Sequence, residues 1–462
     1  MPKKKTALTI EERLQQALVP AEEQPYDVPE NWVWVRLGEV VDVLNGDRGK
    51  NYPAKSTLSK EGIPFISAAN LCDNIVVEDD LLCMSEEQYS KLSAGKLMLN
   101  DIVLCIRGSL GKHGKFPFKK GAIASSLVIM RSKDRGRLTD GYVMQYLDVP
   151  LFYDEIKKYD NGTAQPNLAA KNLELFSFPL PPRSEQQRIV ERIEELFAKL
   201  DEAKERLQEA ADSFAVRKAA ILYKAFTGEL TKQWRRENGV SDESWEEKKG
   251  EDFFEYVTSG SRGWAKYYSD KGSIFVRMGN LNHGTIELDF SDIQYVELPD
   301  QVEGQRSKLQ KNDILISITA DVGMIGLVRE DMDAYINQHV ALARPKNDLY
   351  AEFLAWYFVS DVGLQQMQNK QRGATKIGLG LQDIRSIILK IPTLSEQHEI
   401  VRLIDDLLAR ERAARQATEQ ALASIDLMKK SILARAFRGE LGTNKASEAS
   451  ALELLRQVLA EN

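Results

Sequence analysis

Two short runs that mix basic, aromatic and glycine residues recur far apart in this chain. GDRGKNY spans residues 46–52, and GSRGWAKY spans residues 260–267. Arginine can donate two parallel hydrogen bonds to guanine, and asparagine pairs in the same way with adenine. Glycine lets a backbone approach a ligand closely. These runs therefore predict DNA contact by Arg48, Lys50, Asn51, Tyr52, Arg262, Trp264, Lys266 and Tyr267.

A basic stretch lies further along the first half of the chain. Between Arg107 and Arg137 there are nine Lys or Arg residues and one acid, Asp134, with Phe116 and Phe118 interleaved. Clustered basic side chains suit contact with phosphates, although a charged loop facing water would show the same composition. Two late polar loops add further candidates. This group predicts DNA contact by Arg107, Lys112, Lys115, Gln165, Asn167, Arg372 and Lys376.

Catalytic and metal-binding motifs are missing from the sequence. There is no Asn/Asp-Pro-Pro-Tyr/Phe run of the adenine-methyltransferase type, and GSLGKHGK at 108–115 departs from the phosphate-loop spacing. The four histidines are scattered, and three cysteines are crowded into the first quarter without a Cys-x-x-Cys spacing. We therefore expect no catalytic residue and no metal site, and a reducing, cytoplasmic location.

The composition is that of a globular chain with several domains. Its 462 residues are 43% hydrophobic and 28% charged, without an apolar run of the roughly 20 residues that a membrane span needs. The first residues have a basic start but no apolar stretch of the signal-peptide kind. The net charge of −7 is a weak argument against DNA binding, because surface charges are screened beyond about 8 Å at physiological salt.

An internal repeat organises the chain. Residues 184–230 and 395–441 are identical at 19 of 47 positions without a gap, at a distance of 211 residues. The preceding segments match more loosely: Asn100-Asp101-Ile102 corresponds to Asn312-Asp313-Ile314. The protein is therefore predicted to contain two copies of one unit, each a variable globular segment followed by a shared segment.

The shared segment has the apolar spacing of a long helix. Apolar residues alternate steps of four and three, which is the heptad pattern of a coiled coil. A helix of this length would span roughly 65 Å. The apolar face of such a helix must pack against another element. We expect that element to be the equivalent helix of the other copy; the alternative is that each helix packs on its own domain. The predicted seam is Ile189, Ile193, Leu196, Leu200, Leu207, Phe214, Ile400, Ile404, Leu407, Ile425, Met428 and Ile432.

The globular segments are predicted to mix strands and helices. Strands are expected at 102–106 and 314–318, and helices around 142–156 and 350–367. The predicted fold is α+β: two mixed α/β domains separated by two long antiparallel coiled-coil helices, with a pseudo-two-fold repeat of about 211 residues. The expected order is an N-terminal helical segment (1–31), the first domain (32–183), a long helix (184–232), the second domain (243–394), a long helix (395–441) and a C-terminal helical segment (442–462).

The shared segment also carries a family resemblance. It begins with PLPPRSEQQRIV at 179–190, it ends in Ala-Phe-x-Gly-Glu-Leu in both copies, and the second copy departs from the pattern with Ile391-Pro392-Thr393-Leu394. This duplicated set resembles the specificity (S) subunit of type I restriction–modification enzymes over nearly the whole chain.

The resemblance implies a non-catalytic subunit whose two target recognition domains read the halves of an asymmetric, bipartite DNA site. The helices would act as a spacer ruler and as a docking platform for two methyltransferase (M) subunits and two restriction/translocase (R) subunits. S-adenosylmethionine, ATP and Mg would belong to those partners. The alternative is a coiled-coil scaffold or DNA-mimic regulatory protein that does not read sequence, which the net acidity would suit.

Overall fold

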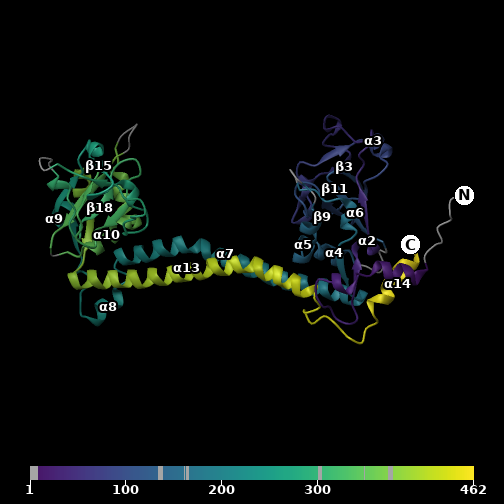
Figure 1. The fold of residues 1–462 in the computed structure, drawn as a ribbon. Coiled ribbons are helices and arrows are strands. Elements are labelled where there is room, and N and C mark those ends of the chain that lie inside the picture. Colours follow the sequence, from purple (N-terminus) through teal and green to yellow (C-terminus); the bar gives the residue numbers. More distant parts are fainter. Residues whose placement is uncertain are drawn as a thin grey trace. The chain divides into compact units, whose positions relative to one another are not determined.

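The computed structural model describes residues 9–133, 139–160, 162, 166–299, 304–347, 349–372 and 378–461. The chain forms two compact units. One comprises Met1–Arg206 with Ala421–Asn462, and the other comprises Leu207–Gln420. In each unit a globular domain lies on a stretch of two long helices (Figure 1).

The described strands of the first domain form a six-stranded sheet, a four-stranded sheet and a two-stranded pair. Hydrophobic residues from both larger sheets, among them Ile66, Phe116 and Ile129, pack into one cluster between them. The six-stranded sheet has the order β2 (Val41–Asn45), β11 (Leu127–Ser132), β8 (Ile102–Cys105), β9 (His113–Lys115), β5 (Asn74–Val76) and β4 (Leu71–Cys72). The four-stranded sheet has the order β6 (Leu82–Met84), β3 (Ile63–Ile66), β10 (Lys120–Ile123) and β7 (Lys96–Met98).

The second domain repeats this plan with two four-stranded sheets among its described strands. Strand β3 pairs in parallel with β10, and β16 pairs in parallel with β20, so the two domains share this uncommon connection. One sheet has the order β14 (Phe254–Ser259), β21 (Val340–Pro345), β18 (Ile314–Ser317) and β19 (Ile325–Leu327). The other has the order β15 (Tyr268–Ser269), β17 (Tyr295–Val296), β16 (Ser273–Val276) and β20 (Ala334–Ile336).

The matched Asn-Asp pairs in the sequence start the central strands. Asn100 and Asn312 have φ values of 69° and 74°, a left-handed conformation that asparagine tolerates better than most residues. The aspartate that follows each of them forms a two-pronged ion pair with an arginine on the neighbouring strand. These pairs are Asp101 with Arg131 and Asp313 with Arg344. The predicted strands at 102–106 and 314–318 are therefore confirmed as β8 and β18.

Each domain places two short helices between its sheet and the long helices. They are α4 (Asp140–Tyr146) and α5 (Pro150–Tyr159) in the first domain, and α10 (Ala351–Val359) and α11 (Asp361–Asn369) in the second. The sequence predicted one helical stretch at each place, and the structure divides both. Pro150 starts α5 because a proline fits the first turn, and the Ser360 hydroxyl caps α11 by accepting from the Gly363 amide at 3.3 Å.

The two long helices are α7 (Arg183–Phe226) and α13 (Leu394–Ala436). In the first unit Lys429 of α13 pairs with Asp201 of α7 at 2.5 Å. In the second unit Arg217 of α7 pairs with Glu411 of α13 at 2.9 Å. The residue numbers rise along one helix as they fall along the other, so the helices are antiparallel.

Most residues of the predicted seam are buried or half-buried, and one is exposed. Ile189, Ile193, Ile400, Ile404 and Ile425 are at most 3% exposed. The remaining predicted residues on α7 are half-buried, as are Leu407 and Ile432. Met428, in contrast, is 46% exposed, whereas Leu408 and Leu433 are each 4% exposed. The register differs because both helices also pack against the domains, and this turns their buried faces away from a pure heptad seam.

The end of each long helix packs on the domain of the other copy. Phe437, just after α13, stacks on Tyr142 of the first domain with ring centroids 4.7 Å apart. Phe226, at the end of α7, contacts Phe353 and Tyr357 of the second domain. Gly228 and Gly439 follow the two helices with φ values of 78° and 73°, the left-handed geometry of a helix stop.

The Gln of each Ser-Glu-Gln motif fastens a domain to the helix that follows it. The Gln186 side chain accepts from the Thr139 amide at 3.0 Å and donates to the Pro181 carbonyl at 3.1 Å. Gln397 repeats both contacts, with the Tyr350 amide at 3.0 Å and the Pro392 carbonyl at 2.9 Å. The second copy has Lys390-Ile391-Pro392-Thr393 where the first has Pro179-Leu180-Pro181-Pro182, and the contact is the same because the proline whose carbonyl accepts the bond is present in both.

The Glu of the first motif binds the segment that follows the other helix. Glu185 is fully buried. It accepts from the Trp32 indole and from the Asn444 amide, both at 2.8 Å, and from the Thr443 hydroxyl at 3.3 Å. A buried carboxylate requires such donors because its charge has lost its hydration.

The Glu of the second motif occupies the equivalent position, and one of its hydrogen-bond donors is a charged side chain. Glu396 is fully buried. It accepts from the Thr231 hydroxyl and from the Arg235 guanidinium, each at 2.6 Å. Arg235 belongs to α8 (Lys232–Glu237), which follows α7. Each helix start is thus bonded to the chain beyond the end of the antiparallel helix.

The chain ends contribute the two short helices that the sequence predicted near them. These are α1 (Ile10–Ala17) and α14 (Ala451–Glu461), which pack together in the apolar cluster of the first unit. None of the described helices, the two long ones included, combines the length and the apolar character that a membrane span needs.

We expect Glu396→Ala to destabilise the second unit by about 3–5 kcal/mol, because it leaves Arg235 buried without its main counter-charge. Urea-induced unfolding of the full chain measures the change. Glu419→Ala is the matched control, since Glu419 forms an exposed pair with Arg415 on the same helix. An exposed pair contributes about 0–1 kcal/mol. Equal destabilisation by both variants would contradict the role given to Glu396.

Candidate nucleic-acid interface

Four loops of each domain meet at one surface. Loop A follows the first strand of the main sheet (46–52 and 260–267), loop B follows the central strand (106–112 and 318–324), and loop C joins β10 to β11 and β20 to β21 (124–126 and 337–339). Loop D is the late polar loop, of which residues 160, 162 and 166–169 are described in the first domain and residues 370–372 and 378–380 in the second.

Loops A and C of the first domain are joined by two hydrogen bonds. The Arg48 guanidinium donates to the Ser125 carbonyl at 3.2 Å, and the Ser125 amide donates to the Tyr52 hydroxyl at 3.4 Å. Asp47 holds loop A from the inside, because it accepts from the Gly49 amide at 2.7 Å and from the Ser93 amide at 2.9 Å. These hydrogen bonds hold the pKa of Asp47 below its ordinary value.

Loops C, B and D continue the same surface. The Ile106 amide donates to the Ser126 carbonyl, and the Leu168 amide donates to the Ile106 carbonyl, both at 2.9 Å. The Arg107 side chain donates to the Asn167 side chain at 3.2 Å. The structure therefore brings together three separate segments that the sequence marked as candidates, with loop C between them.

The second domain has the same order of loops. Ser261 of loop A forms a bridge with Asn337 of loop C. The Ile318 amide donates to the His339 carbonyl at 3.0 Å, and the Leu379 amide donates to the Ile318 carbonyl at 2.9 Å. The arrangement is thus a property of the repeated unit.

Most of the candidate basic side chains face solvent. Exposed candidates in the first domain are Arg48, Lys50, Arg107 and Lys112, and those in the second domain are Arg262, Lys266 and Arg372. Loops A and B of the first domain carry four basic residues and one acid, Asp47, which is turned inward. The surface is therefore locally positive on a chain with a net charge of −7.

Some candidates are already bonded within the protein. The Lys112 amine donates to the Ala68 carbonyl at 2.9 Å, and the Asn51 amide donates to the Lys91 carbonyl at 2.8 Å. Arg372 pairs with Asp383 at 3.0 Å. The Lys266 amine lies over the Tyr267 ring, 4.9 Å from its centroid. Gln165 and Lys376 lie outside the described residues.

Two predicted contacts need correction. Trp264 is 5% exposed and stacks on Phe275, so it is a core residue of the second domain. Lys115 is exposed but pairs with Ile102 at the start of β8, the end of that strand remote from loop B. Phe116, which the sequence suggested as part of a DNA-contacting stretch, is fully buried.

Loop C was missed by the sequence reasoning. It contributes Ser125 and Ser126 in the first domain and Asn337, Gln338 and His339 in the second. His339 is exposed, and its Nδ1 lies 2.7 Å from the Thr319 hydroxyl of loop B. The available signal was a short polar interruption between two β-rich runs, at corresponding places in the two copies.

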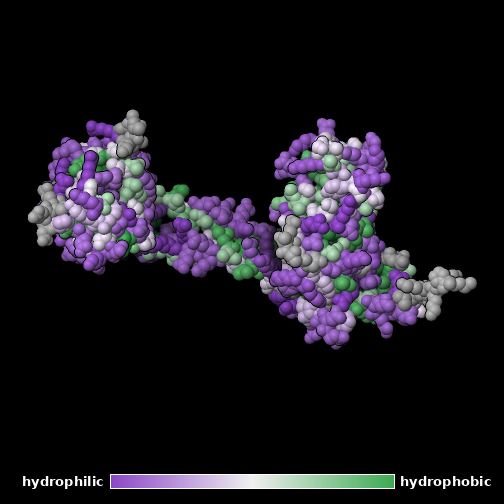
Figure 2. Space-filling view, turned by 45° about the horizontal axis from the view of Figure 1, so that its top comes forward, coloured by the Kyte–Doolittle hydropathy of each residue, from purple (hydrophilic) through white to green (hydrophobic). Residues whose placement is uncertain are grey.

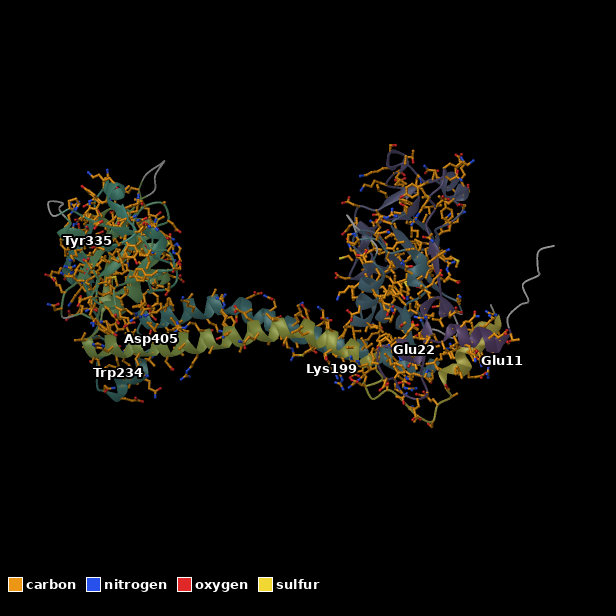
Figure 3. The ribbon with its side chains drawn as sticks, viewed as in Figure 1. Glu11, Glu22, Lys199, Trp234, Tyr335 and Asp405 are labelled. Atoms are coloured by element: carbon orange, nitrogen blue, oxygen red, sulfur yellow. The ribbon has the colours of Figure 1, made fainter. Side chains whose placement is uncertain are left out.

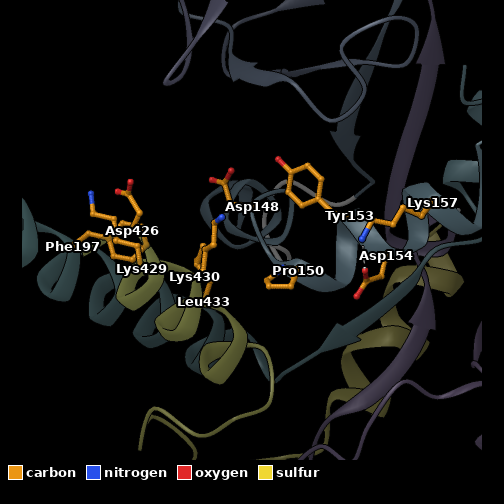
Figure 4. A pocket seen from close by; sticks show the side chains of 10 residues that line it. All are labelled: Asp148, Pro150, Tyr153, Asp154, Lys157, Phe197, Asp426, Lys429, Lys430 and Leu433. Carbon is orange, nitrogen blue, oxygen red and sulfur yellow. Dashed lines mark hydrogen bonds and ion pairs between the residues drawn. The ribbon is translucent and has the colours of Figure 1, made fainter. Parts of the chain in front are cut away.

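The first unit also has a cavity of about 630 Å³ between α5 and the long helices (Figure 4). Phe197 and Lys429 are among its lining residues. The second unit has a cavity of about 360 Å³, lined in part by Leu408 and Lys218. These residues correspond pairwise at the repeat distance of 211, so the cavities are equivalent.

In the part of the chain that the structure describes, no group of three or more His, Cys, Asp or Glu side chains is placed to hold a metal ion.

A duplicated, loop-bearing domain on paired helices defines a class of DNA sequence-recognition subunits. The chain belongs to the family described as the type I restriction modification DNA specificity domain, whose model matches residues 29–211 and 242–422. Specificity subunits of type I restriction–modification systems are non-catalytic and generally hold no cofactor. The family implies DNA recognition within a complex with methyltransferase and restriction subunits.

Similar proteins span almost the whole chain. The type I restriction enzyme EcoBI specificity subunit of Escherichia coli is 29% identical, over 94% of this chain and 93% of that protein. The EcoKI specificity subunit of Escherichia coli (strain K12) is 26% identical, over 94% and 96%. The crystal structure of the HsdS subunit from Thermoanaerobacter tengcongensis has the same fold, with a TM-score of 0.67 at 18% identity, over 91% of this chain and 100% of that one.

We expect Arg48→Ala to weaken duplex binding about tenfold and to lower the slope of log affinity against log salt by about one. Arg48 lies on the four-loop surface, whereas Lys115, equally basic and exposed, does not. Lys115→Ala is therefore the control and should leave both quantities unchanged. Fluorescence anisotropy at two salt concentrations, with the methyltransferase subunit present, measures them. A larger effect from Lys115→Ala would place the interface at the other end of β8.

Proposed function

We propose that this chain is the DNA sequence-specificity subunit of a type I restriction–modification system, in which each target recognition domain reads one half of a bipartite site. The observation that carries this proposal is the four-loop surface, which occurs once in each domain with the same backbone hydrogen bonds among loops B, C and D. Two such surfaces on one chain suit two half-sites.

The site should be asymmetric, because the side chains at equivalent loop positions differ. Arg107 corresponds to Thr319, and Ser125 and Ser126 of loop C correspond to Gln338 and His339. Direct readout depends on which donors and acceptors face the base edges. Domains with different side chains on the same backbone should therefore recognise different bases.

The long helices would serve as a ruler between the half-sites. A helix of 44 residues such as α7 has a length of about 66 Å, and its antiparallel pairing with α13 stiffens both. The length of the helices, rather than the loops, would then determine the spacer between the two recognised sequences.

The helices would also dock the partner subunits, namely two M subunits that methylate adenine N6 and two R subunits. S-adenosylmethionine, ATP and Mg would be bound by those partners. Val216 on α7 is 70% exposed and Leu427 on α13 is 67% exposed, and they are 211 residues apart, the repeat distance. Figure 2 shows apolar side chains on the surface of the long helices. An equivalent exposed aliphatic residue in each copy, close in sequence to residues of an equivalent cavity, suits two identical M subunits.

A genome-wide map of N6-methyladenine tests the proposed function. The chain is expressed with its neighbouring methyltransferase subunit in a host without such methylation. We expect one bipartite, asymmetric motif that is absent without this chain. Arg262→Ala should relax one half of the motif, at a cost of about 1–3 kcal/mol, and preserve the other half. Association of the two proteins without any new motif would favour the scaffold or DNA-mimic alternative.

For the docking surface, we expect Val216→Asp and Leu427→Asp each to remove one methyltransferase subunit, and the double variant to remove both. A charge placed on an apolar contact loses its hydration when the partner binds. Native mass spectrometry counts the bound subunits. Gln420→Asp introduces the same charge at an exposed, polar position of α13 and should bind both partners. Full binding by the double variant, with its helical content intact, would place the docking surface elsewhere.

A further inference from the structure

The first domain contains a large cavity beside its loops A and C. Its volume is about 750 Å³, within the range of roughly 300–1,000 Å³ that is typical of small-ligand sites. Tyr52 of loop A and Ala124 of loop C belong to its lining, together with Phe65 and the two carboxylates of Asp79 and Asp80. The cavity therefore adjoins the proposed DNA-reading surface, and Tyr52, one of the predicted DNA contacts, lines it.

The lining has the chemistry of a nucleobase site. The Tyr52 ring is 36% exposed and meets Phe65 edge to face, with centroids 5.8 Å apart, so that it offers a surface on which a flat ring can stack. Asp79 and Asp80 are exposed carboxylates, which accept hydrogen bonds from an exocyclic amine. Asp80 also pairs with Lys60 at 3.1 Å, so Asp79 is the carboxylate that the proposal uses as the acceptor.

In the second domain, aromatic side chains fill the corresponding position. Phe65 pairs with Ala122 across the sheet, whereas the equivalent Phe275 pairs with Tyr335. Trp264 of loop A packs between these two rings, at centroid distances of 5.7 Å from Phe275 and 5.5 Å from Tyr335. Tyr335 is labelled in Figure 3. The equivalent cavity is reduced to about 130 Å³.

We propose that the cavity of the first domain binds a nucleobase that carries an exocyclic amine, such as adenine or cytosine. This proposal rests on the proposed DNA-reading role of the adjoining loops. A base turned out of the duplex is one source, and a free nucleoside is the other. Proteins that hold an extruded base stack it against aromatic side chains and bond its polar edge, which is the combination of groups found here.

Three variants separate the cavity from its surroundings. Ala69→Trp fills it from an exposed position of its lining, and so imitates the tryptophan of the second domain. Asp79→Ala removes one acceptor. Glu78→Ala is the matched control, because Glu78 is an exposed acid next in sequence that does not line the cavity. An unchanged circular dichroism spectrum and unchanged reading of the other half-site show that each variant is folded.

In the first arm of the experiment, adenosine, cytidine and thymidine are titrated separately into the full chain bound to its methyltransferase subunit. Isothermal titration calorimetry measures the binding. If a free nucleoside is the source, adenosine or cytidine binds saturably and thymidine at least tenfold more weakly. Ala69→Trp and Asp79→Ala should then weaken that binding at least tenfold, and Glu78→Ala should leave it unchanged.

The second arm places 2-aminopurine at each position of the recognised duplex. If the base comes from DNA, one position changes its fluorescence on binding, and this change is lost in Ala69→Trp but kept in Glu78→Ala. Failure of both arms overturns the proposal, as does a response that Ala69→Trp leaves intact. If the wild-type complex does not bind duplex at all, the proposed function fails, and the nucleoside arm alone then decides whether the cavity binds a base.

Discussion

The scaffold depends on two buried carboxylates, Glu185 and Glu396. Each is fully buried, so each requires donors from the protein. Those donors come from the segment that follows the antiparallel helix: Asn444 and Thr443 for the first, Thr231 and Arg235 for the second. Since the start of each helix is bonded to the end of the other, the two copies of the repeat hold one another in place.

The neighbouring glutamine extends this constraint to the domains. Gln186 and Gln397 bond the backbone on both sides of their helix starts in the same way. Phe437 and Phe226 add an aromatic contact from the opposite helix. Each domain is thus held by the helix that follows it and by the end of the other helix. These contacts lie in the shared segments, which are identical at 19 of 47 positions.

The four-loop surface is held together differently from the scaffold. Its geometry comes from backbone hydrogen bonds such as those of Ile106 and Ile318, which any side chain permits. Most of the loop side chains face solvent and differ between the domains, whereas Trp264 of loop A is buried. The residues beneath the loops differ as well, because the first domain has Ala122 and an open cavity and the second has Tyr335 and a filled one. The two domains therefore combine a shared loop backbone with different side chains.

The amino-acid sequence was sufficient to identify the repeat and to predict the two long helices and the central strands. It also shows that recognisable catalytic motifs are absent. Identity at a fixed distance, heptad spacing and motif spacing are all properties of the linear chain. It was also sufficient to propose loops A and D in both domains, because they recur at equivalent positions, and loop B in the first domain, because that loop is basic.

The tertiary structure alone decided which of these residues meet. It places Trp264 in a core, Lys115 at the far end of its strand and Met428 in solvent, and it brings loop C between the other loops. The sequence alone does not distinguish an exposed aromatic residue from a buried one. The difference between them lies in neighbours such as Phe275 and Tyr335, which only the folding of distant strands brings together.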